Sequence, residues 1–536
     1  MLEKNKVYRA RIQGYTSEGL GVARIDGQAV FVHQALRGEE CDILVLKVLK
    51  NAAFGKTVRV YEPSPHRVEP DCPYYGRCGG CDFRHMDRAE ELAAKRQRVQ
   101  DALARIGGSA VTVEGIDGGE PLHYRNKSQY PVAADGSVGF YKARSHQVIP
   151  VERCCIQKPQ ADAAAQALRT YLRLYGVSCY DEKTRRGLVR YLYVRTNGAG
   201  QSLLCVLVNG KKLPHERELV DLLRQAVPET VGVVLGVNTR PTGAVLGQEY
   251  RTLWGADVLT DTLCGLTFRL SVPSFYQVNR EMAEVLYRRA VEFAGLTGTE
   301  TVLDLYCGAG TITQVMARHA GRVIGAEIVP EAIEDARANA QRNGVENVEF
   351  FCGDAAAAAD FARRGLRPDV ICVDPPRKGL APEVVHAAAQ MAPKRIVYVS
   401  CDPATLARDV KLMAQEGYRA IRAAAVDMFP GTANVETICL LSKLNAKQHI
   451  EINLDMDELD LTDAEKKATY QEIKDYVLEH SGLKVSSLYI AQVKQKCGII
   501  ERENYNKPKS EDAKQPQCPP DKEKAIKEAL THFGMI

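Results

Sequence analysis

The sequence predicts an α/β protein built around a doubly wound, mostly parallel sheet. Runs of β-forming residues recur through residues 271–444, helical stretches such as 330–343 separate them, and Gly-rich or Asp-Pro turns end several strands. This alternation is typical of βαβ units, whose strands lie parallel. The strand cores are expected at 301–306, 323–327, 348–351, 370–374, 395–399 and 437–441.

Residues 1–62 predict a small β domain ahead of this sheet. Short strands are expected at 7–12, 19–25 and 29–32, and turn residues separate them. The pattern fits any small β domain, or more sharply an oligonucleotide-binding barrel. Four residues supply basic charge near its end: Lys47, Lys50, Lys56 and Arg59.

Residues 63–270 are expected to form a central α/β domain. A short linker at 63–66 precedes a group of cysteines, and a charged amphipathic helix is predicted at 88–106. Basic residues adjoin aromatic ones at 124–128 and 187–195. Such mixtures suit single-stranded RNA through stacking and phosphate contacts, and an ordinary solvated sheet face is the alternative.

Residues 445–536 differ in character and are expected to form a helical extension. A capping box at 462–465 predicts a helix through about 479, and Ser487 predicts the start of a second helix that ends near Lys496. The Lys/Pro/Gln-rich stretch 507–523 is expected to be flexible. The helices suit either a helix-turn-helix or a docking pair, and three lysines favour nucleic-acid binding: Lys484, Lys494 and Lys496.

Composition narrows the class of protein. The 536 residues are 45% hydrophobic and 26% charged, as in a soluble protein of three or four domains. The net charge of +4 requires any nucleic-acid surface to be local. No apolar run reaches the roughly 18–20 residues that span a bilayer, and the N-terminal segment lacks a signal core. We therefore expect a cytoplasmic protein without a membrane partner, whose 16 cysteines form no disulfide framework.

A Gly-rich loop at 304–311 joins a predicted strand to a helix and is a candidate cofactor site. Glu327 ends the next strand, where a carboxylate would bond ribose hydroxyls. The loop has Gly-x-Gly without the third glycine of the dinucleotide fingerprint. With Cys-Gly-Asp at 352–354 near an adenine edge, the pattern favours S-adenosylmethionine (SAM) over NAD.

Two further strand ends carry the candidate chemistry. Cys401 follows a run of β-formers and precedes an Asp-Pro, and Asp374 begins a rigid Asp-Pro-Pro-Arg turn. A thiolate there would add to C6 of a pyrimidine and make C5 nucleophilic, while Asp374 bonds the base. Glu436, just before the last strand, is placed to remove the C5 proton. The plainer alternatives are a structural thiol and a solvated carboxylate.

Cysteines with Cys-x5-Cys-x2-Cys spacing are candidates to hold a metal centre: Cys72, Cys78 and Cys81. The adjacent Gly79 and Gly80 let the backbone pack close to an inorganic core. The group needs a fourth ligand. A structural zinc site is the main alternative to a cluster, although paired Cys-x2-Cys knuckles are more usual for zinc.

Four motifs together resemble the RNA uracil-5-methyltransferases: Ser-Phe-Tyr-Gln-Val-Asn at 274–279, the loop at 304–310, Asp-Pro-Pro-Arg at 374–377 and Ser-Cys-Asp-Pro at 400–403. The resemblance covers residues 271–444. It implies a Rossmann-like SAM methyltransferase domain and makes residues 1–62 a TRAM domain, the family's RNA-binding barrel. It implies Cys401 as the nucleophile at uracil C6 and Glu436 as the general base. The residues implied to line the SAM and base pocket are Gln277, Tyr306, Glu327 and Asp374.

The cysteine spacing resembles that of the 23S rRNA members of this family, which implies a 4Fe–4S cluster. The fourth ligand is then Cys154, with Cys155 as an apolar filler, and the cluster would hold the TRAM and central domains together. The function implied is methylation of uridine C5 in 23S rRNA by a monomer. The alternatives are a tRNA uracil-5-methyltransferase, a non-catalytic rRNA-binding factor and an iron–sulfur radical enzyme, although the Cys-x3-Cys-x2-Cys spacing of the last class is absent.

One segment departs from the family pattern. Before the general base the family usually has Pro-His-Thr-x-His-x-Glu, and this chain has Gly431 and Asn434 at the two histidine positions. Glu436 itself is present. The departure therefore concerns the loop that carries the base.

Overall fold

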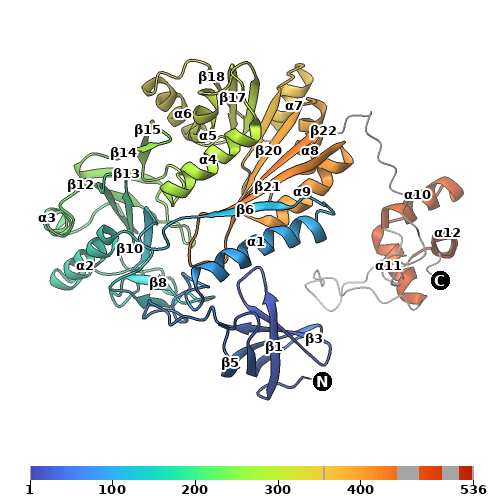
Figure 1. Cartoon of the computed structure of the whole chain (residues 1–536), viewed down its shortest axis with the longest axis horizontal. Helices are drawn as coiled ribbons and strands as arrows, with labels where there is room; N and C mark the ends of the chain where they lie inside the picture. The colour runs from blue at the N-terminus through green and yellow to red at the C-terminus, as the bar shows by residue number, and fades with distance from the viewer. Residues whose placement is uncertain (1, 354–355, 444–469, 498–517, 534–536) are drawn as a thin grey trace. The chain divides into compact units, whose positions relative to one another are not determined.

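The computed structural model describes residues 2–353, 356–443, 470–497 and 518–533. The chain divides into two compact units, Met1–Ala446 and Lys447–Ile536. The first unit contains a closed barrel, a five-stranded sheet and an eight-stranded sheet with helices on both faces (Figure 1). The α/β class and the N-terminal barrel predicted from the sequence are confirmed.

The barrel closes because its first strand pairs with both the second and the fourth. Its strand order is β1-β2-β3-β5-β4, and Val7 of β1 lies opposite Leu44 of β4. Alternate side chains, such as Ile12, Val30 and Ile43, are fully or almost fully buried inside. The strands are β1 (Val7–Tyr15), β2 (Gly21–Ile25), β3 (Gln28–His33), β4 (Glu40–Val48) and β5 (Ala52–Glu62).

The central sheet has the order β13-β12-β11-β10-β7, and helices α2 (Pro159–Leu174) and α3 (Glu216–Ala226) pack on one of its faces. Its strands are β7 (Lys127–Pro131), β10 (Val189–Thr196), β11 (Ser202–Val208), β12 (Thr230–Val237) and β13 (Glu249–Gly255). Two small hairpins adjoin it: β8 (Gly139–Tyr141) with β9 (Val148–Pro150), and β14 (Val258–Leu263) with β15 (Leu266–Ser271).

The prediction that the stretch 187–195 contacts RNA is wrong for its two arginines. Strand β10 is buried along its whole length. Arg190 donates hydrogen bonds to the backbone carbonyls of Asn238, Arg240 and Thr242. Arg195 is 2% exposed and donates to the Ser274 carbonyl. These guanidinium groups therefore bind protein carbonyls rather than phosphates.

The eight-stranded sheet has the order β18-β17-β16-β19-β20-β22-β21-β6. The first five strands in this order are mutually parallel, and β22 runs antiparallel to β20 and β21. The six strands predicted between 301 and 441 are all present. They are β16 (Thr301–Leu305), β17 (Arg322–Glu327), β18 (Val348–Cys352), β19 (Val370–Val373), β20 (Arg395–Ser400) and β22 (Glu436–Lys443).

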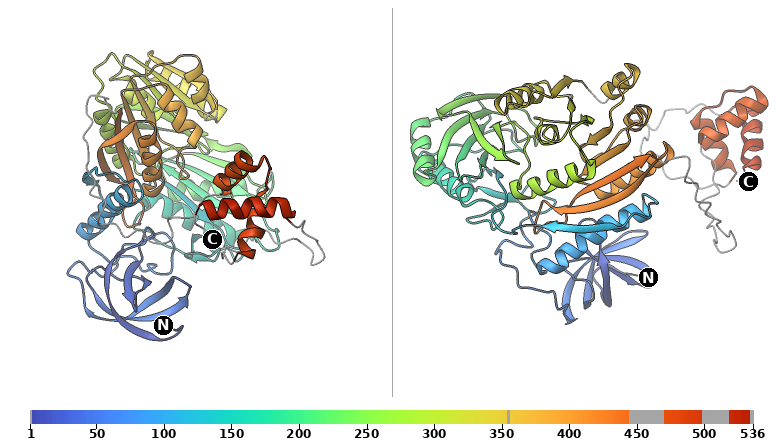
Figure 2. Two further views of the ribbon diagram at one scale, coloured as in Figure 1. Left: turned by 90° about the vertical axis from the view of Figure 1, so that its right-hand side faces the viewer. Right: turned by 45° about the horizontal axis from the view of Figure 1, so that its top comes forward.

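Two strands of this sheet lie outside the predicted set, β21 (Tyr418–Asp427) and β6 (Val113–Gly118). The Ala-rich sequence of β21 carries little β signal. Strand β6 pairs in parallel with β21 from about 300 residues away and forms the sheet edge (Figures 1 and 2). Residues 88–118, placed by the sequence in the segment 63–270, thus supply a helix and a strand to this sheet.

Helices cover both faces of the sheet. One cluster of apolar side chains joins it to α4 (Arg280–Ala294) and α5 (Thr311–Ala317). A second cluster, on the opposite face, joins it to α1 (Arg88–Arg105), α7 (Ala356–Arg363), α8 (Pro382–Gln390) and α9 (Pro403–Gln415). Helix α6 (Pro330–Arg342) packs against β18. The carboxyl ends of the parallel strands remain open at one edge.

A buried charge network fastens α1 to the end of β21. The Lys95 ammonium is fully buried and bonds Asp427 Oδ1 at 2.6 Å and Glu91 Oε1 at 2.7 Å. Arg88 pairs with both Asp427 and Glu91. Because each buried charge has an opposite partner, the network holds helix and strand in one arrangement.

The second unit is a small helical cluster of α10 (Tyr470–Ser481), α11 (Ser487–Lys496) and α12 (Pro520–His532) around Ile473, Ile490 and Ile526. The helix predicted to end near Lys496 is present, but Ser486, not Ser487, caps it by accepting from the Tyr489 amide. The capping box at 462–465 lies outside the described residues. Within the stretch 507–523 predicted to be flexible, the described part includes the first turn of α12.

The lysines that favoured nucleic-acid binding are partly engaged within this unit. Lys494 is 4% exposed, and Lys496 pairs with Glu523 at 2.5 Å. They therefore give that hypothesis little support. No helix in the described part of the chain is both long and apolar enough to cross a membrane.

Replacing Lys95 with Met should destabilise the first unit by about 3 kcal/mol, because Asp427 and Glu91 lose their shared buried partner. Urea-induced unfolding measures the change. Arg105→Met on the same helix is the matched control, since its ion pair with Asp101 is exposed and should contribute less than about 1 kcal/mol. Equal effects of the two substitutions would contradict the importance of the network.

Candidate active site

One cavity of about 1400 Å³ lies where the parallel strands β16, β17, β19 and β20 end. In open α/β sheets this edge is where ligands bind. The cavity is lined by the six residues that the family resemblance assigned to the SAM, base and catalytic sites: Gln277, Tyr306, Glu327, Asp374, Cys401 and Glu436. Of the stretch 352–354 expected near the adenine, Gly353 lines the cavity, Cys352 does not, and Asp354 lies outside the described residues.

The Gly-rich loop after β16 shapes one end of the cavity. Tyr306 has a φ of 67° and Gly310 a φ of 74°, so the chain turns through the left-handed region. At Gly310 a side chain would also meet the Phe350 ring at 3.0 Å. The Glu327 carboxylate accepts hydrogen bonds from the backbone amides of Gly308 at 3.2 Å and Ile328 at 2.9 Å. These bonds fix the carboxylate at the cavity wall.

Cys401 is held between strand β20 and helix α9. Asp402 caps the helix by accepting from the Ala404 amide at 2.8 Å, and the Ser400 hydroxyl accepts from the Asp402 amide at 3.1 Å. The half-buried thiol faces the cavity. Burial and the nearby Glu436 raise the pKa of Cys401 to about 11, and the Arg377 guanidinium opposes that rise.

Two carboxyl groups share the site with Cys401, the buried Glu436 and the partly exposed Asp374. Burial raises the pKa of Asp374 to about 7. Burial, with a further contribution from Asp374, raises the pKa of Glu436 to about 8, and Arg377 again opposes the rise. A carboxyl that titrates close to neutral pH suits proton transfer.

Residues 274–278 also line the cavity and are held by the central domain. The Arg195 guanidinium donates to the Ser274 carbonyl at 2.6 Å, and the Asn126 amide group donates to the Gln277 carbonyl at 2.9 Å. The Phe275 ring is 66% exposed at the cavity. Sequence reasoning did not single out Phe275 or Arg377, although both stand inside motifs that it recognised.

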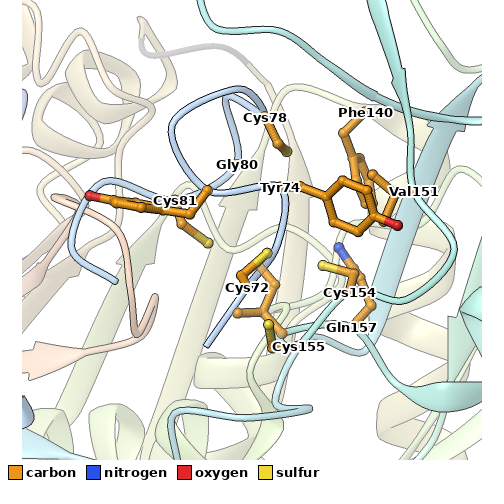
Figure 3. A pocket seen from close by; sticks show the side chains of 12 residues that line it. Cys72, Tyr74, Cys78, Gly80, Cys81, Phe140, Val151, Cys154, Cys155 and Gln157 are labelled. Atoms are coloured by element: carbon orange, nitrogen blue, oxygen red, sulfur yellow. The ribbon is translucent and has the colours of Figure 1, made fainter. Parts of the chain in front are cut away.

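The predicted cysteine ligands converge elsewhere in the first unit. A small apolar pocket is lined by Cys72, Cys78, Cys81, Cys154 and Cys155 (Figure 3). In Figure 3 the sulfurs of Cys72, Cys78, Cys81 and Cys154 surround a common space, and the Cys155 sulfur lies below Cys72. Among the described residues, no three His, Cys, Asp or Glu side chains are arranged to hold a metal ion.

Comparisons with known proteins agree with this geometry. The family model described as tRNA (Uracil-5-)-methyltransferase matches residues 87–444, and a TRAM domain model matches residues 2–58. An uncharacterized RNA methyltransferase of Clostridium tetani is 42% identical over 453 residues, which cover 83% of this chain and 98% of that protein. Another, from Halalkalibacterium halodurans, is 42% identical over 451 residues, with 83% and 98% covered.

The fold is similar to the crystal structure of Pyrococcus abyssi tRNA (uracil-54, C5)-methyltransferase in complex with S-adenosyl-L-homocysteine. The TM-score is 0.66 at 25% identity, and the match covers 81% of this chain and 100% of that one. The family match ends at residue 444, so the helical extension lies beyond it. From the family model and the relatives together, the chain belongs to the tRNA (uracil-5-)-methyltransferase family.

Proposed function

We propose that this protein methylates C5 of a uridine in 23S rRNA with SAM as methyl donor. The observation that carries the proposal is the meeting of Cys401, Asp374 and Glu436 in one cavity with the Gly-rich loop. The P. abyssi structure contains S-adenosyl-L-homocysteine, the product that such a transfer would leave. The TRAM match and the relatives named RNA methyltransferases support an RNA substrate.

The residues divide the reaction between them. The Cys401 thiol loses its proton to solvent and its sulfur bonds to C6 of the uracil, so that the C5=C6 electron pair moves toward C5 and makes it nucleophilic. SAM supplies the methyl group that C5 takes up. Glu436 then removes the proton from C5, and the electron pair of that C–H bond restores the C5=C6 double bond as the Cys401 sulfur leaves. Asp374 bonds the polar edge of the base and holds it in the cavity.

A tRNA substrate is the second candidate, because the similar P. abyssi structure is that of a tRNA (uracil-54, C5)-methyltransferase. The cysteine pocket favours rRNA, since its spacing resembles that of the 23S rRNA members. The two candidates share the site and the chemistry. They differ only in the RNA that reaches the cavity.

We also propose that the cysteine pocket holds a 4Fe–4S cluster through Cys72, Cys78, Cys81 and Cys154. Thiols and apolar groups line the pocket, and thiolates are the ligands that such clusters take. The four sulfurs surround a common space in Figure 3, and the Cys-x5-Cys-x2-Cys spacing lacks the paired Cys-x2-Cys knuckles that are more usual for zinc. Methyl transfer needs no electrons, so the role of the cluster would be structural.

The covalent step predicts an adduct with RNA that contains 5-fluorouridine, because fluorine at C5 blocks proton removal. A 23S rRNA fragment should be trapped and tRNA should not, as judged by slower migration of the protein in denaturing gels. Cys401→Ala should form no adduct and should lose methyl transfer by more than about 1,000-fold. Cys179→Ala, another half-buried cysteine, is the matched control. No adduct with the unaltered protein would contradict the mechanism, and trapping of tRNA alone would reverse the choice of substrate.

Glu436 predicts how the rate depends on pH. Only the ionised carboxylate takes a proton, and its pKa is raised to about 8, so proton removal should accelerate with pH through that value, and ionisation of the Cys401 thiol, whose pKa is about 11, adds a rise at higher pH. Release of tritium from 5-tritiated uridine RNA between about pH 6 and pH 10 measures this step. Glu436→Gln should slow it by about 100-fold or more and remove the rise near pH 8, leaving the rise that follows ionisation of Cys401.

The same carboxyl predicts a pH-dependent stability. Its pKa rises from 4.5 in the unfolded chain to about 8 in the folded one, so the unfolded state holds fewer protons between those values and stability falls as pH rises. Glu436→Gln should therefore raise Tm more near pH 8 than near pH 5. An equal change at both would argue against the buried carboxyl as the titrating group.

The cysteine pocket predicts which substitutions remove iron. Cys154→Ser should lower iron and sulfide content, with loss of the visible absorbance of protein prepared without oxygen, whereas Cys155→Ser should retain them. Elemental analysis of the purified variants measures both. Zinc in place of iron would contradict the cluster. Loss of iron from Cys155→Ser but not from Cys154→Ser would make Cys155 the fourth ligand and Cys154 the apolar filler.

A further inference from the structure

The loop that carries the base is bonded along most of its backbone. This base loop, residues 428–435, joins β21 to Glu436 at the start of β22. Its Phe429 and the adjoining Glu436 both line the cavity. A general base works only while its carboxylate stays within hydrogen-bond reach of the proton, so the contacts that hold this loop determine where the base stands.

Helix α1 holds the base loop from one side through three charged side chains. Glu91 Oε1 accepts from the Gly431 amide at 2.6 Å. Lys95 donates to the Phe429 carbonyl at 3.1 Å, and Arg98 donates to the Ala433 carbonyl at 2.6 Å. The helix that carries the buried charge network thus also binds the loop.

The cysteine pocket holds the base loop from the other side. Residues 81–84, here the cysteine turn, begin at Cys81 and donate the backbone amides of Asp82 and Phe83 to the Gly431 carbonyl at 2.8 and 2.9 Å. The Asp82 carboxylate accepts from the Ala433 amide at 2.9 Å. Phe83 and Ala433 pack in one small apolar cluster. Three hydrogen bonds and an apolar contact therefore join the turn to the loop.

Gly431 lies against the cysteine turn. Its φ is +80°, and a side chain there would stand 3.3 Å from Arg84 Cδ and 3.8 Å from Cys81 Sγ. A histidine at this position would be strained in φ and would crowd the cysteine turn. The departure from the family pattern thus allows the loop to lie directly against the turn.

We propose that the cysteine turn positions Glu436, with Asp82 as the positioning residue, so that the cysteine pocket acts on proton removal through the base loop. The inference rests on the function proposed above and adds a role for the pocket in that reaction. Glu436 lies three residues after Ala433, the point that Asp82 holds. A loosened loop should therefore leave methyl transfer to C5 intact and delay the step that follows it.

The test separates these two steps in the full-length protein. Asp82→Ala removes the acceptor for the Ala433 amide, and we expect it to slow tritium release from 5-tritiated uridine RNA about tenfold, with methylated covalent adduct accumulating on ordinary RNA. Asp82→Asn keeps an acceptor oxygen and should restore most of the rate. SAM affinity, measured by calorimetry, should match that of the unaltered protein in both variants.

A carboxylate outside the turn provides the matched control. Asp101 of helix α1 pairs with the exposed Arg105 at 3.4 Å, and it contacts neither the base loop nor the cysteine turn, so Asp101→Asn should release tritium at the unaltered rate. If Asp82→Ala fails to fold, Gly431→Ala takes its place, because its added side chain displaces the loop from the turn and should give the same accumulation of adduct.

The outcomes distinguish the inference from the proposed function. If the unaltered protein forms no adduct with 5-fluorouridine RNA, the proposed function fails. If it forms that adduct but Asp82→Ala, or Gly431→Ala in its place, releases tritium at the unaltered rate, the positioning role fails. If Asp82→Ala and Asp82→Asn slowed tritium release equally, the positioning role would also fail, because the acceptor oxygen that asparagine retains would then make no difference.

Discussion

The buried ion pair between Lys95 and Asp427 is the constraint on which the site depends. Charges removed from water are tolerated only when their partners are in place, so this contact permits one arrangement of helix and strand. Asp427 is the last residue of β21, and the base loop begins immediately after it. The network therefore fixes the point from which the chain starts toward Glu436. It also binds segments that are 332 residues apart in sequence.

Inside the cavity, burial sets the chemistry. Desolvation raises the pKa of Asp374, and desolvation together with the nearby Asp374 raises the pKa of Glu436. Ionisation of the buried Glu436 lowers the stability of the fold, and Tyr306 adds a backbone conformation that non-glycine residues rarely adopt. A buried carboxyl and a strained backbone conformation, both of which lower stability, thus lie together at this edge of the sheet. Such features are expected at a functional site, because the site needs polar groups that a well-packed core would not contain.

The site residues that stand at the ends of strands could be predicted from the sequence, because the strands themselves are visible as runs of β-forming residues. Cys401, Asp374 and Glu327 each follow a run of β-forming residues, and parallel strands bring such ends to one edge, so their meeting was predictable. Contacts between distant segments carried no such signal. The arginines of β10 looked like RNA contacts because a sequence does not show which carbonyls will accept from them. Strand β6 was missed because its partner, the Ala-rich β21, has little β character.

The cysteine turn connects three parts of the first unit at one point. Phe83 packs with Leu36 of the barrel and Ala433 of the base loop, and a side chain at Gly19 of the barrel would stand 2.7 Å from the Phe83 ring. A pocket that only tied the barrel to the central domain would need no contact with the base loop. The amides of Asp82 and Phe83 both donate to Gly431, so the turn is bonded to the loop as directly as it is packed against the barrel. The same short segment therefore contacts the barrel and the loop that leads to Glu436, and glycine at position 431, where the family usually has histidine, leaves room for that contact.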